Sequence, residues 1–168
     1  MLSNPTPQIL KNSAFQAKTF DLEDEGTWKE ESFTADEIYG LIRSINDPEH
    51  PVTLEQLSVV RPEHIRLDPM FGPEHPEQQR VLVEFTPTIP HCSMATLIGL
   101  CIRVKLWQML PRTFVTEVRI RQGTHAQENS INKQLLDKER VAAALENDQL
   151  AAVVQECLYG APRMGIAL

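Results

Sequence analysis

Apolar residues are scattered without a period through residues 1–33 and then recur at regular intervals, which separates an arm from a folded domain. The arm also carries the acidic cluster Asp21, Glu23, Asp24 and Glu25. Such a stretch buries too little surface to offset its ordering entropy, so we predict a flexible acidic arm. Its side chains most suited to anchoring a partner are Phe15, Phe20 and Trp28.

A helical pattern opens the domain at Thr34. Thr34 and Glu37 have the spacing of a capping box, in which each side chain bonds the other residue's backbone N–H. Apolar residues then follow at helical spacing, namely Ile38, Leu41, Ile42 and Ile45. Asp47-Pro48 ends the pattern, because a residue before proline avoids the helical region. We therefore expect a helix from Thr34 to Asn46.

Strand-like segments alternate with one long apolar run in the middle of the chain. Alternation or β-branched residues predict strands at Leu57–Val60, Ile65–Leu67, Val81–Phe85 and Phe114–Arg121. The first of these could pair with the second, and a loop rich in proline and acid follows at 68–79. Residues 93–110 are nearly all apolar and are bounded by Pro90 and Pro111, which favours a buried helix.

Two further helices are expected near the end of the chain. Ile131–Leu145 is amphipathic, and we expect its inward face to consist of Leu135, Leu136, Val141, Ala142 and Leu145. Asn147 or Asp148 would cap a last helix at Gln149–Leu158, which Gly160 could close. This order predicts a compact α+β domain over residues 34–160, with a small mixed sheet packed against helices and a tail at 161–168.

Composition and charge narrow the class of function. A net charge of -7 and a pI of about 5.2 argue against binding to nucleic acid or to anionic membranes. No apolar run approaches the roughly 20 residues that span a bilayer, and residues 1–10 lack the features of a secretory signal. The chain has three cysteines, and free thiols in a reducing cytosolic or nuclear compartment are expected.

Cys92 is the strongest candidate for chemistry. It lies in the segment 86–96, between the end of a strand and the start of the long helix, in a loop that Pro87 and Pro90 stiffen. A helix start carries partial positive charge and free N–H groups, so a thiol there is expected to ionise easily and to bind metal well. His91 could act as a base or a second ligand. Alternatively, Cys92 is simply a small buried residue.

The other polar positions give weaker signals. Cys101 falls about 13 Å further along a regular helix, too far to share a metal with Cys92, and we expect it in the core. Cys157 is expected to serve packing or lie at the surface, and no Cys-x-x-Cys pair occurs. His125 is expected to be a satisfied loop histidine. Phosphate-binding and hydrolase motifs are absent from the sequence, which argues against an enzyme.

Two long segments carry a resemblance to a known family. They are Ser44-Ile45-Asn46-Asp47-Pro48-Glu49-His50-Pro51 and Phe85-Thr86-Pro87-Thr88-Ile89-Pro90-His91-Cys92-Ser93-Met94-Ala95-Thr96. With Gly123-Thr124-His125-Ala126 and the stretch 132–147, they extend the resemblance from about Thr34 to Leu158. On these residues the chain resembles the cytosolic iron–sulfur assembly component 2 family, also called the MIP-eighteen family. That family is related to SufT-like and PaaD-like proteins.

The resemblance implies a non-catalytic adaptor of a cytosolic iron–sulfur targeting complex. Its partners would be a WD-repeat propeller protein, a HEAT-repeat scaffold and apo client proteins of cytoplasm and nucleus, with a link to chromosome segregation and a possible homodimer. The family's reactive cysteine falls on Cys92 and its Asp-Pro-Glu motif on Asp47, Pro48 and Glu49, while its threonines fall on Thr86 and Thr88. His125 lies in a further matching block.

Two mechanisms that use Cys92 remain open from the sequence, beside a third possibility in which the domain is only a scaffold and its partners do all the ligation. In the first, the Cys92 thiolate transiently binds an iron–sulfur cluster or a metal, and His91, a second subunit, a partner or a client supplies the other ligands. In the second, Cys92 is the nucleophile of an enzyme and His91 is its base. Neighbouring residues at a loop–helix junction rarely point both side chains at one atom, which favours the first mechanism.

Overall fold

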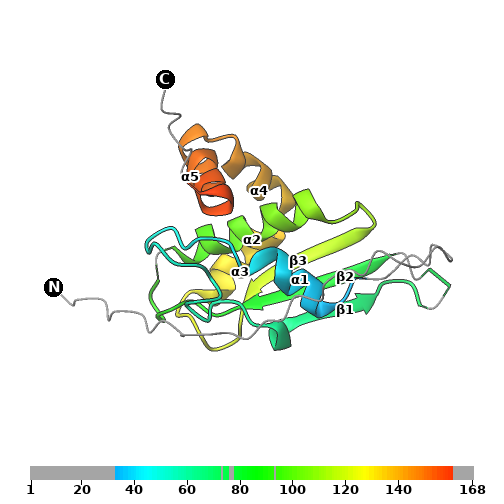
Figure 1. The fold of residues 1–168 in the computed structure, drawn as a ribbon. Helices are drawn as coiled ribbons and strands as arrows, with labels where there is room; N and C mark the ends of the chain where they lie inside the picture. The colour runs from blue at the N-terminus through cyan, green and yellow to red at the C-terminus, as the bar shows by residue number, and fades with distance from the viewer. Residues whose placement is uncertain (1–32, 73, 76–77, 93, 161–168) are drawn as a thin grey trace, which may run out of the picture.

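The computed structural model describes residues 33–72, 74–75, 78–92 and 94–160. Its elements run in the order α1 (Ala35–Ile42), η1 (Pro62–His64), β1 (Ile65–Pro69), β2 (Gln79–Phe85), α2 (Ala95–Met109), β3 (Phe114–Ile120), α3 (Glu128–Leu136), α4 (Lys138–Leu145) and α5 (Asp148–Tyr159). Helices and a mixed sheet pack together, which confirms the predicted α+β class (Figure 1). The acidic arm predicted over residues 1–33 lies, apart from Phe33, outside the described residues, as does the tail 161–168.

The sheet has the strand order β1-β2-β3. The pairing of β1 with β2 is antiparallel, whereas β2 and β3 run parallel, with α2 as the crossover between them. In this register Val83 lies beside Ile65 on one side and Val118 on the other, and all three are buried. The parallel pairing places the carboxyl ends of β2 and β3 at the same end of the molecule (Figure 1).

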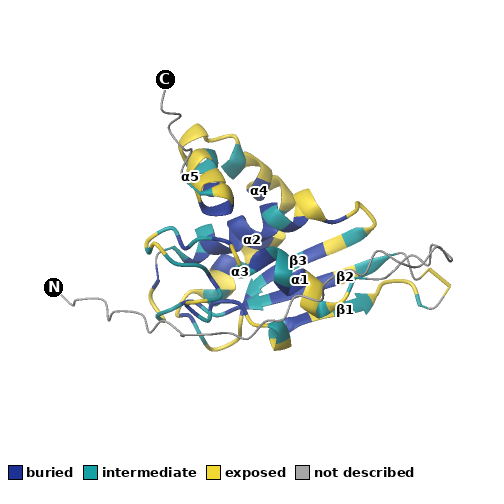
Figure 2. Ribbon diagram, in the orientation of Figure 1, coloured by how far each residue is buried: buried dark blue, intermediate teal, exposed yellow. Residues whose placement is uncertain are grey.

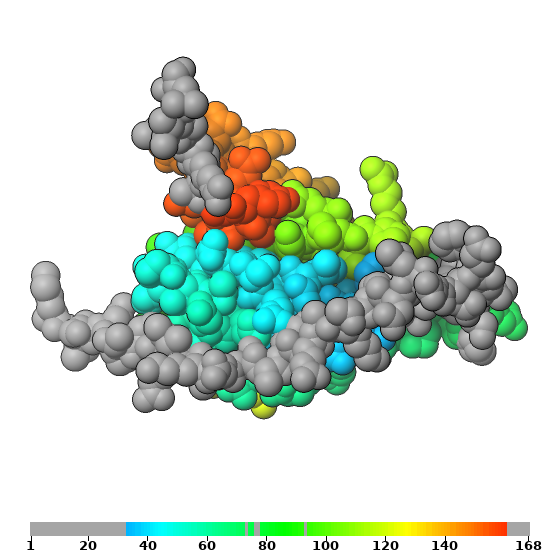
Figure 3. Space-filling model, in the orientation of Figure 1, coloured from blue at the N-terminus to red at the C-terminus, as the bar shows by residue number. Residues whose placement is uncertain are grey.

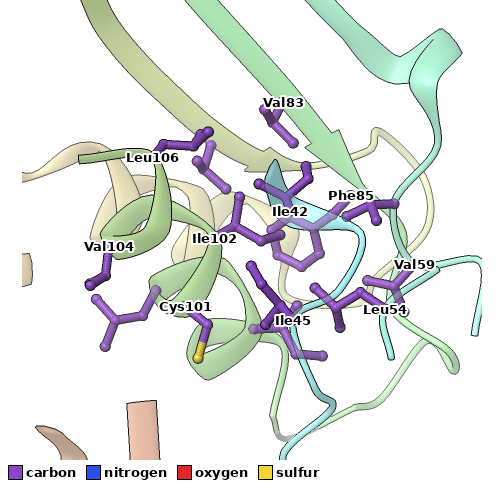
Figure 4. Packing of buried hydrophobic residues seen from close by; sticks show 14 of the residues in the cluster. Ile42, Ile45, Leu54, Val59, Val83, Phe85, Cys101, Ile102, Val104 and Leu106 are labelled. Carbon is purple, nitrogen blue, oxygen red and sulfur yellow. The ribbon is translucent and has the colours of Figure 1, made fainter. Parts of the chain in front are cut away.

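Helix α2 lies at the centre of the core and is buried over most of its length (Figure 2). Ile98, Ile102 and Leu106 are among its fully buried side chains, and Figure 4 shows Ile102 and Leu106 packed with Phe85 and Ile42. A side chain at Gly99 would collide with Leu135, so glycine permits the close approach of α2 and α3. The predicted buried helix is therefore confirmed, although it begins at Ala95 and Ser93 lies outside the described residues.

The first helix begins as predicted and ends early. The Thr34 hydroxyl accepts a hydrogen bond from the Glu37 N–H, and the Glu37 carboxylate accepts one from the Thr34 N–H, which completes the capping box. The helix ends at Ile42 rather than Asn46, and Arg43 instead pairs with Glu55 at 3.0 Å in the following turn. Tyr39 also donates to Glu55 at 3.1 Å, so this carboxylate fixes the turn against α1.

Leu57–Val60 is not a strand, contrary to the prediction. It forms a turn in which Ser58 takes a positive φ of 56°, while Leu57, Val59 and Val60 are buried. The predicted partner, Ile65–Leu67, lies within β1 and pairs with β2 instead. Apolar composition therefore identified buried residues here and misassigned their backbone conformation.

The amphipathic segment Ile131–Leu145 is two helices rather than one. Asp137 has extended backbone angles and its side chain accepts from the N–H groups of Glu139 and Arg140, so it ends α3 and caps α4. Leu136 and Ala142 consequently face solvent, although both were predicted to face the core. The buried Arg103 of α2 donates to the Leu135 carbonyl at the end of α3, which compensates one carbonyl left without a helical partner.

The last helix confirms its predicted caps and lies against α2. Asn147 accepts from the N–H groups of Gln149 and Leu150, and Gly160 closes the helix with a φ of 79°. The Asn46 N–H donates to the Cys157 carbonyl at 2.8 Å, which joins α5 to the loop after α1. Within the described residues, no helix has both the length and the apolar character needed to cross a bilayer.

Candidate functional site

The candidate site lies at the carboxyl ends of the two parallel strands. The loop that carries Cys92 follows β2 and the loop that carries His125 follows β3, so the parallel pairing brings both to one end (Figure 1). The Ala126 N–H donates to the Pro90 carbonyl at 2.9 Å, and His125 Nε2 lies 3.0 Å from the Cys92 carbonyl oxygen. The second loop thus holds the backbone of the first.

His125 is buried and both its ring nitrogens have backbone partners. Its Nδ1 accepts from the Gln127 N–H at 3.0 Å, so the ring proton belongs on Nε2, which donates to the Cys92 carbonyl. This tautomer uses both nitrogens for structure. The prediction that His125 is a satisfied histidine is confirmed, and its role here is to position the Cys92 backbone.

Cys92 lies next to the start of α2, as predicted, but its thiol is not easily ionised. Its exposed fraction is 6%, and burial raises the pKa of the Cys92 thiol above its ordinary value. The N–H groups of Met94 and Ala95 bond to the sulfur and oppose that rise, whereas the charges of Glu49 and Asp47 add to it. The expected easy ionisation is therefore wrong, because desolvation outweighs the effect of the helix start.

The Asp47-Pro48-Glu49-His50-Pro51 segment forms a tight turn beside this thiol. One carboxylate oxygen of Asp47 accepts from the N–H groups of Glu49 and His50 at 2.8 and 2.9 Å, and from His50 Nδ1 at 2.9 Å. Because the charges of Asp47 and Glu49 act on Cys92, the fold brings the two segments together although 42 residues lie between Glu49 and Cys92. Glu49 is exposed, so its charge faces solvent beside the turn.

The remaining predicted site residues play different parts. His91 is exposed, whereas Cys92 is buried. Within the described residues, no histidine nitrogen forms a hydrogen bond with the Cys92 sulfur. Thr86 and Thr88 are half-buried, and the Thr86 N–H donates to the Val59 carbonyl at 2.8 Å. The threonines therefore flank the Cys92 loop, while His91 is presented to solvent.

The sequence did not reveal that Asp47 lies near all three cysteines. Its charge makes an upward contribution to the pKa of each of Cys92, Cys101 and Cys157, so one carboxylate lies near thiols from α2, from α5 and from the loop that precedes α2. Cys101 is confirmed as a core residue, and Cys157 is buried as well. No sequence spacing indicates this grouping, because it depends on how α5 packs. Across residues 33–72, 74–75, 78–92 and 94–160, no three Cys, His or acidic side chains are arranged to hold a metal ion.

Comparison with known proteins gives consistent similarities. A family model described as iron-sulfur cluster assembly protein matches residues 35–120, which include Asp47, Glu49 and Cys92 but not His125. The chain is 54% identical over 158 residues to mouse cytosolic iron-sulfur assembly component 2B, covering 94% of this chain and 91% of that protein. It is 50% identical over 157 residues to the MIP18 family protein galla-2 of Drosophila melanogaster, covering 94% and 95%. A Dictyostelium discoideum protein, also named cytosolic iron-sulfur assembly component 2B, is 41% identical over 170 residues, covering 94% and 98%.

Proposed function

The chain belongs to the MIP18 family of iron–sulfur cluster assembly proteins, and on that premise we propose that it serves cytosolic iron–sulfur protein assembly as a non-catalytic adaptor. Its cargo is an iron–sulfur cluster on the way to a client protein, and the sulfur of Cys92 is the atom that contacts this cluster. The observation that carries this proposal is the location of Cys92 at the start of α2, with two backbone N–H groups on its sulfur and two carboxylates nearby.

The chemistry of these groups suits a transient contact. A thiol must lose its proton to bind iron, and the burial that raises the pKa of Cys92 opposes this loss until a cation or a partner changes its surroundings. The carboxylates of Asp47 and Glu49 favour the approach of positive charge, and the Met94 and Ala95 N–H groups then stabilise the thiolate. A cluster takes four thiolate-type ligands, so one cysteine holds it only with ligands from another protein, with exposed His91 available on this side.

This geometry favours the adaptor over a cysteine enzyme. An activated nucleophile needs a base within hydrogen-bond reach and a third group that orients the base. His125 spends both nitrogens on backbone groups, and His91 is exposed while Cys92 is buried. The partners that we propose are those that the family resemblance implies, namely a WD-repeat propeller protein, a HEAT-repeat scaffold and apo client proteins.

Anaerobic reconstitution with iron and sulfide tests the proposal. Absorbance and the transfer of clusters to a client would be compared for wild type and Cys92→Ala, each with and without the propeller protein. Cys157→Ala is the matched control, since it also removes a buried thiol from the same domain. We expect transfer to fall in Cys92→Ala and to persist in Cys157→Ala. Unchanged client maturation in Cys92→Ala would refute a role for this thiol.

A further inference from the structure

A second pair of thiols lies behind the Asp47 turn, apart from Cys92. Cys101 on α2 and Cys157 on α5 are separated by 55 intervening residues, yet their thiols hydrogen-bond to one another where the two helices pack. Figure 4 shows the Cys101 sulfur directed away from the strands, and α5 packs against α2. The cytosolic setting makes a pair of this kind a candidate for transient redox chemistry rather than a permanent disulfide.

Cys157 differs from Cys101 in its access to solvent. A cavity of about 510 Å³ lies between the turn 46–51 and α5, which meet on the face seen in Figure 3. Cys157 lines this cavity together with Asp47, Glu49, His50 and Glu156. Cys101 does not line it and has an exposed fraction of 1%. A small molecule in the cavity therefore reaches Cys157 before it reaches Cys101.

From this arrangement we propose that Cys157 and Cys101 are a peroxide-responsive dithiol, in which Cys157 is oxidised through the cavity and Cys101 resolves the product into a disulfide. The thiolate of Cys157 attacks a hydroperoxide oxygen, which yields Cys157 sulfenic acid and releases water or an alcohol. The Cys101 thiol then attacks the sulfenic sulfur and expels a second water. The two thiols lose two electrons and two protons, and the hydroperoxide takes them up.

The surroundings of the pair support this assignment of roles. The hydrogen bond from Cys101 lowers the pKa of Cys157 and raises that of Cys101, so the thiol at the cavity is the one that ionises more readily. Three carboxylates line the cavity, which repels anionic thiol reagents such as glutathione disulfide and leaves a small neutral hydroperoxide as the favoured oxidant. Because the Asn46 N–H donates to the Cys157 carbonyl, the disulfide would also fasten the Asp47 turn to the core.

The test uses the reduced, full-length protein treated with hydrogen peroxide and then labelled with N-ethylmaleimide. We expect two of the three cysteines to lose labelling in one intramolecular disulfide, which peptide mapping assigns to Cys101 and Cys157. Cys101→Ser should stop at a sulfenic acid on Cys157 that dimedone traps, and Cys157→Ser should leave Cys101 reduced. Cys92→Ser is the matched control and should form the same disulfide as wild type.

Several results would overturn the proposal. One is a wild-type protein in which Cys101 and Cys157 stay labelled at peroxide concentrations that oxidise free cysteine. Another is a disulfide that involves Cys92 instead. A third is oxidation whose rate rises with urea in proportion to global unfolding, which would show that the native cavity gives no access. If a serine variant fails to fold, mapping of the wild-type disulfide and its urea dependence decide the question without it. These outcomes do not depend on cluster transfer, so they are independent of the proposed function.

Discussion

Replacing His125 with alanine should release the Cys92 loop while leaving the rest of the fold in place. His125 holds the Cys92 carbonyl through Nε2 and the Gln127 N–H through Nδ1, each at 3.0 Å. Leaving a buried acceptor such as the Cys92 carbonyl unpaired costs about 1–3 kcal/mol, whereas the backbone N–H of exposed Gln127 can bond to water instead. We therefore expect the free energy of unfolding to fall by about 2 kcal/mol in His125→Ala.

The local effect should be larger at Cys92 than at the other thiols. If a loss of about 2 kcal/mol acts on the opening of this loop, the open population rises about 30-fold, since each 1.4 kcal/mol is a factor of ten. Alkylation of the native protein by iodoacetamide, followed at each cysteine by mass spectrometry, measures that population. Cys101, in the core, reports global unfolding in the same sample.

His91→Ala is the matched control for this experiment. His91 is exposed, and surface substitutions without such contacts change stability by about 0.5 kcal/mol or less. We expect its unfolding free energy and its Cys92 alkylation rate to stay close to wild type. The reasoning fails if His125→Ala labels Cys92 no faster than His91→Ala does, or if Cys92 and Cys101 accelerate in parallel.

Substitutions at three further positions test separate parts of the structure. Glu49→Gln removes a charge that raises the pKa of Cys92, so the pH–rate profile of Cys92 alkylation should move to lower pH. A profile that stays where it is in wild type would contradict the proximity of Glu49 and Cys92. Burial and the bond to Glu55 raise the pKa of Tyr39 to about 12, so its contribution to stability is complete below about pH 10 and is lost as the pH rises through about 12. Tyr39→Phe should abolish the phenolate absorbance that develops near that pH and cost about 1 kcal/mol in urea unfolding. Asn147→Ala removes the cap of α5 and should cost about 1 kcal/mol, measured in the same way, while Asn147→Asp should retain most of the stability.

Elements whose signals are local were predictable from the sequence. The capping box at Thr34, the alternation along β3 and the length of the apolar run in α2 each depend on residues a few positions apart. The break at Asp137 was missed because its neighbours keep a helical apolar spacing on both sides. An aspartate followed by Glu139 and Arg140 is equally compatible with a helix interior and with a cap, and tertiary packing decides between them.

The candidate site was only partly predictable, for a different reason. The position of Cys92 at a helix start follows from the proline loop and the apolar run, but the ionisation of its thiol depends on burial that no motif encodes. His125 was expected to be satisfied, yet its partner could not be named, since Cys92 and His125 meet only when β2 and β3 pair in parallel. The grouping of Asp47 with Cys101 and Cys157 likewise requires the packed position of α5.

The hydrogen bond from the Asn46 N–H to the Cys157 carbonyl has a consequence for synthesis of the chain. Cys157 leaves the ribosome 111 positions after Asn46, so the turn at Asp47 lacks this support while most of the polypeptide is being made. Domains tend to fold as units once their residues have emerged, and here the turn at Asp47 is complete only after α5 has been synthesised. A nascent chain that stops before Cys157 would therefore present Cys92 beside an acidic turn that lacks this hydrogen bond.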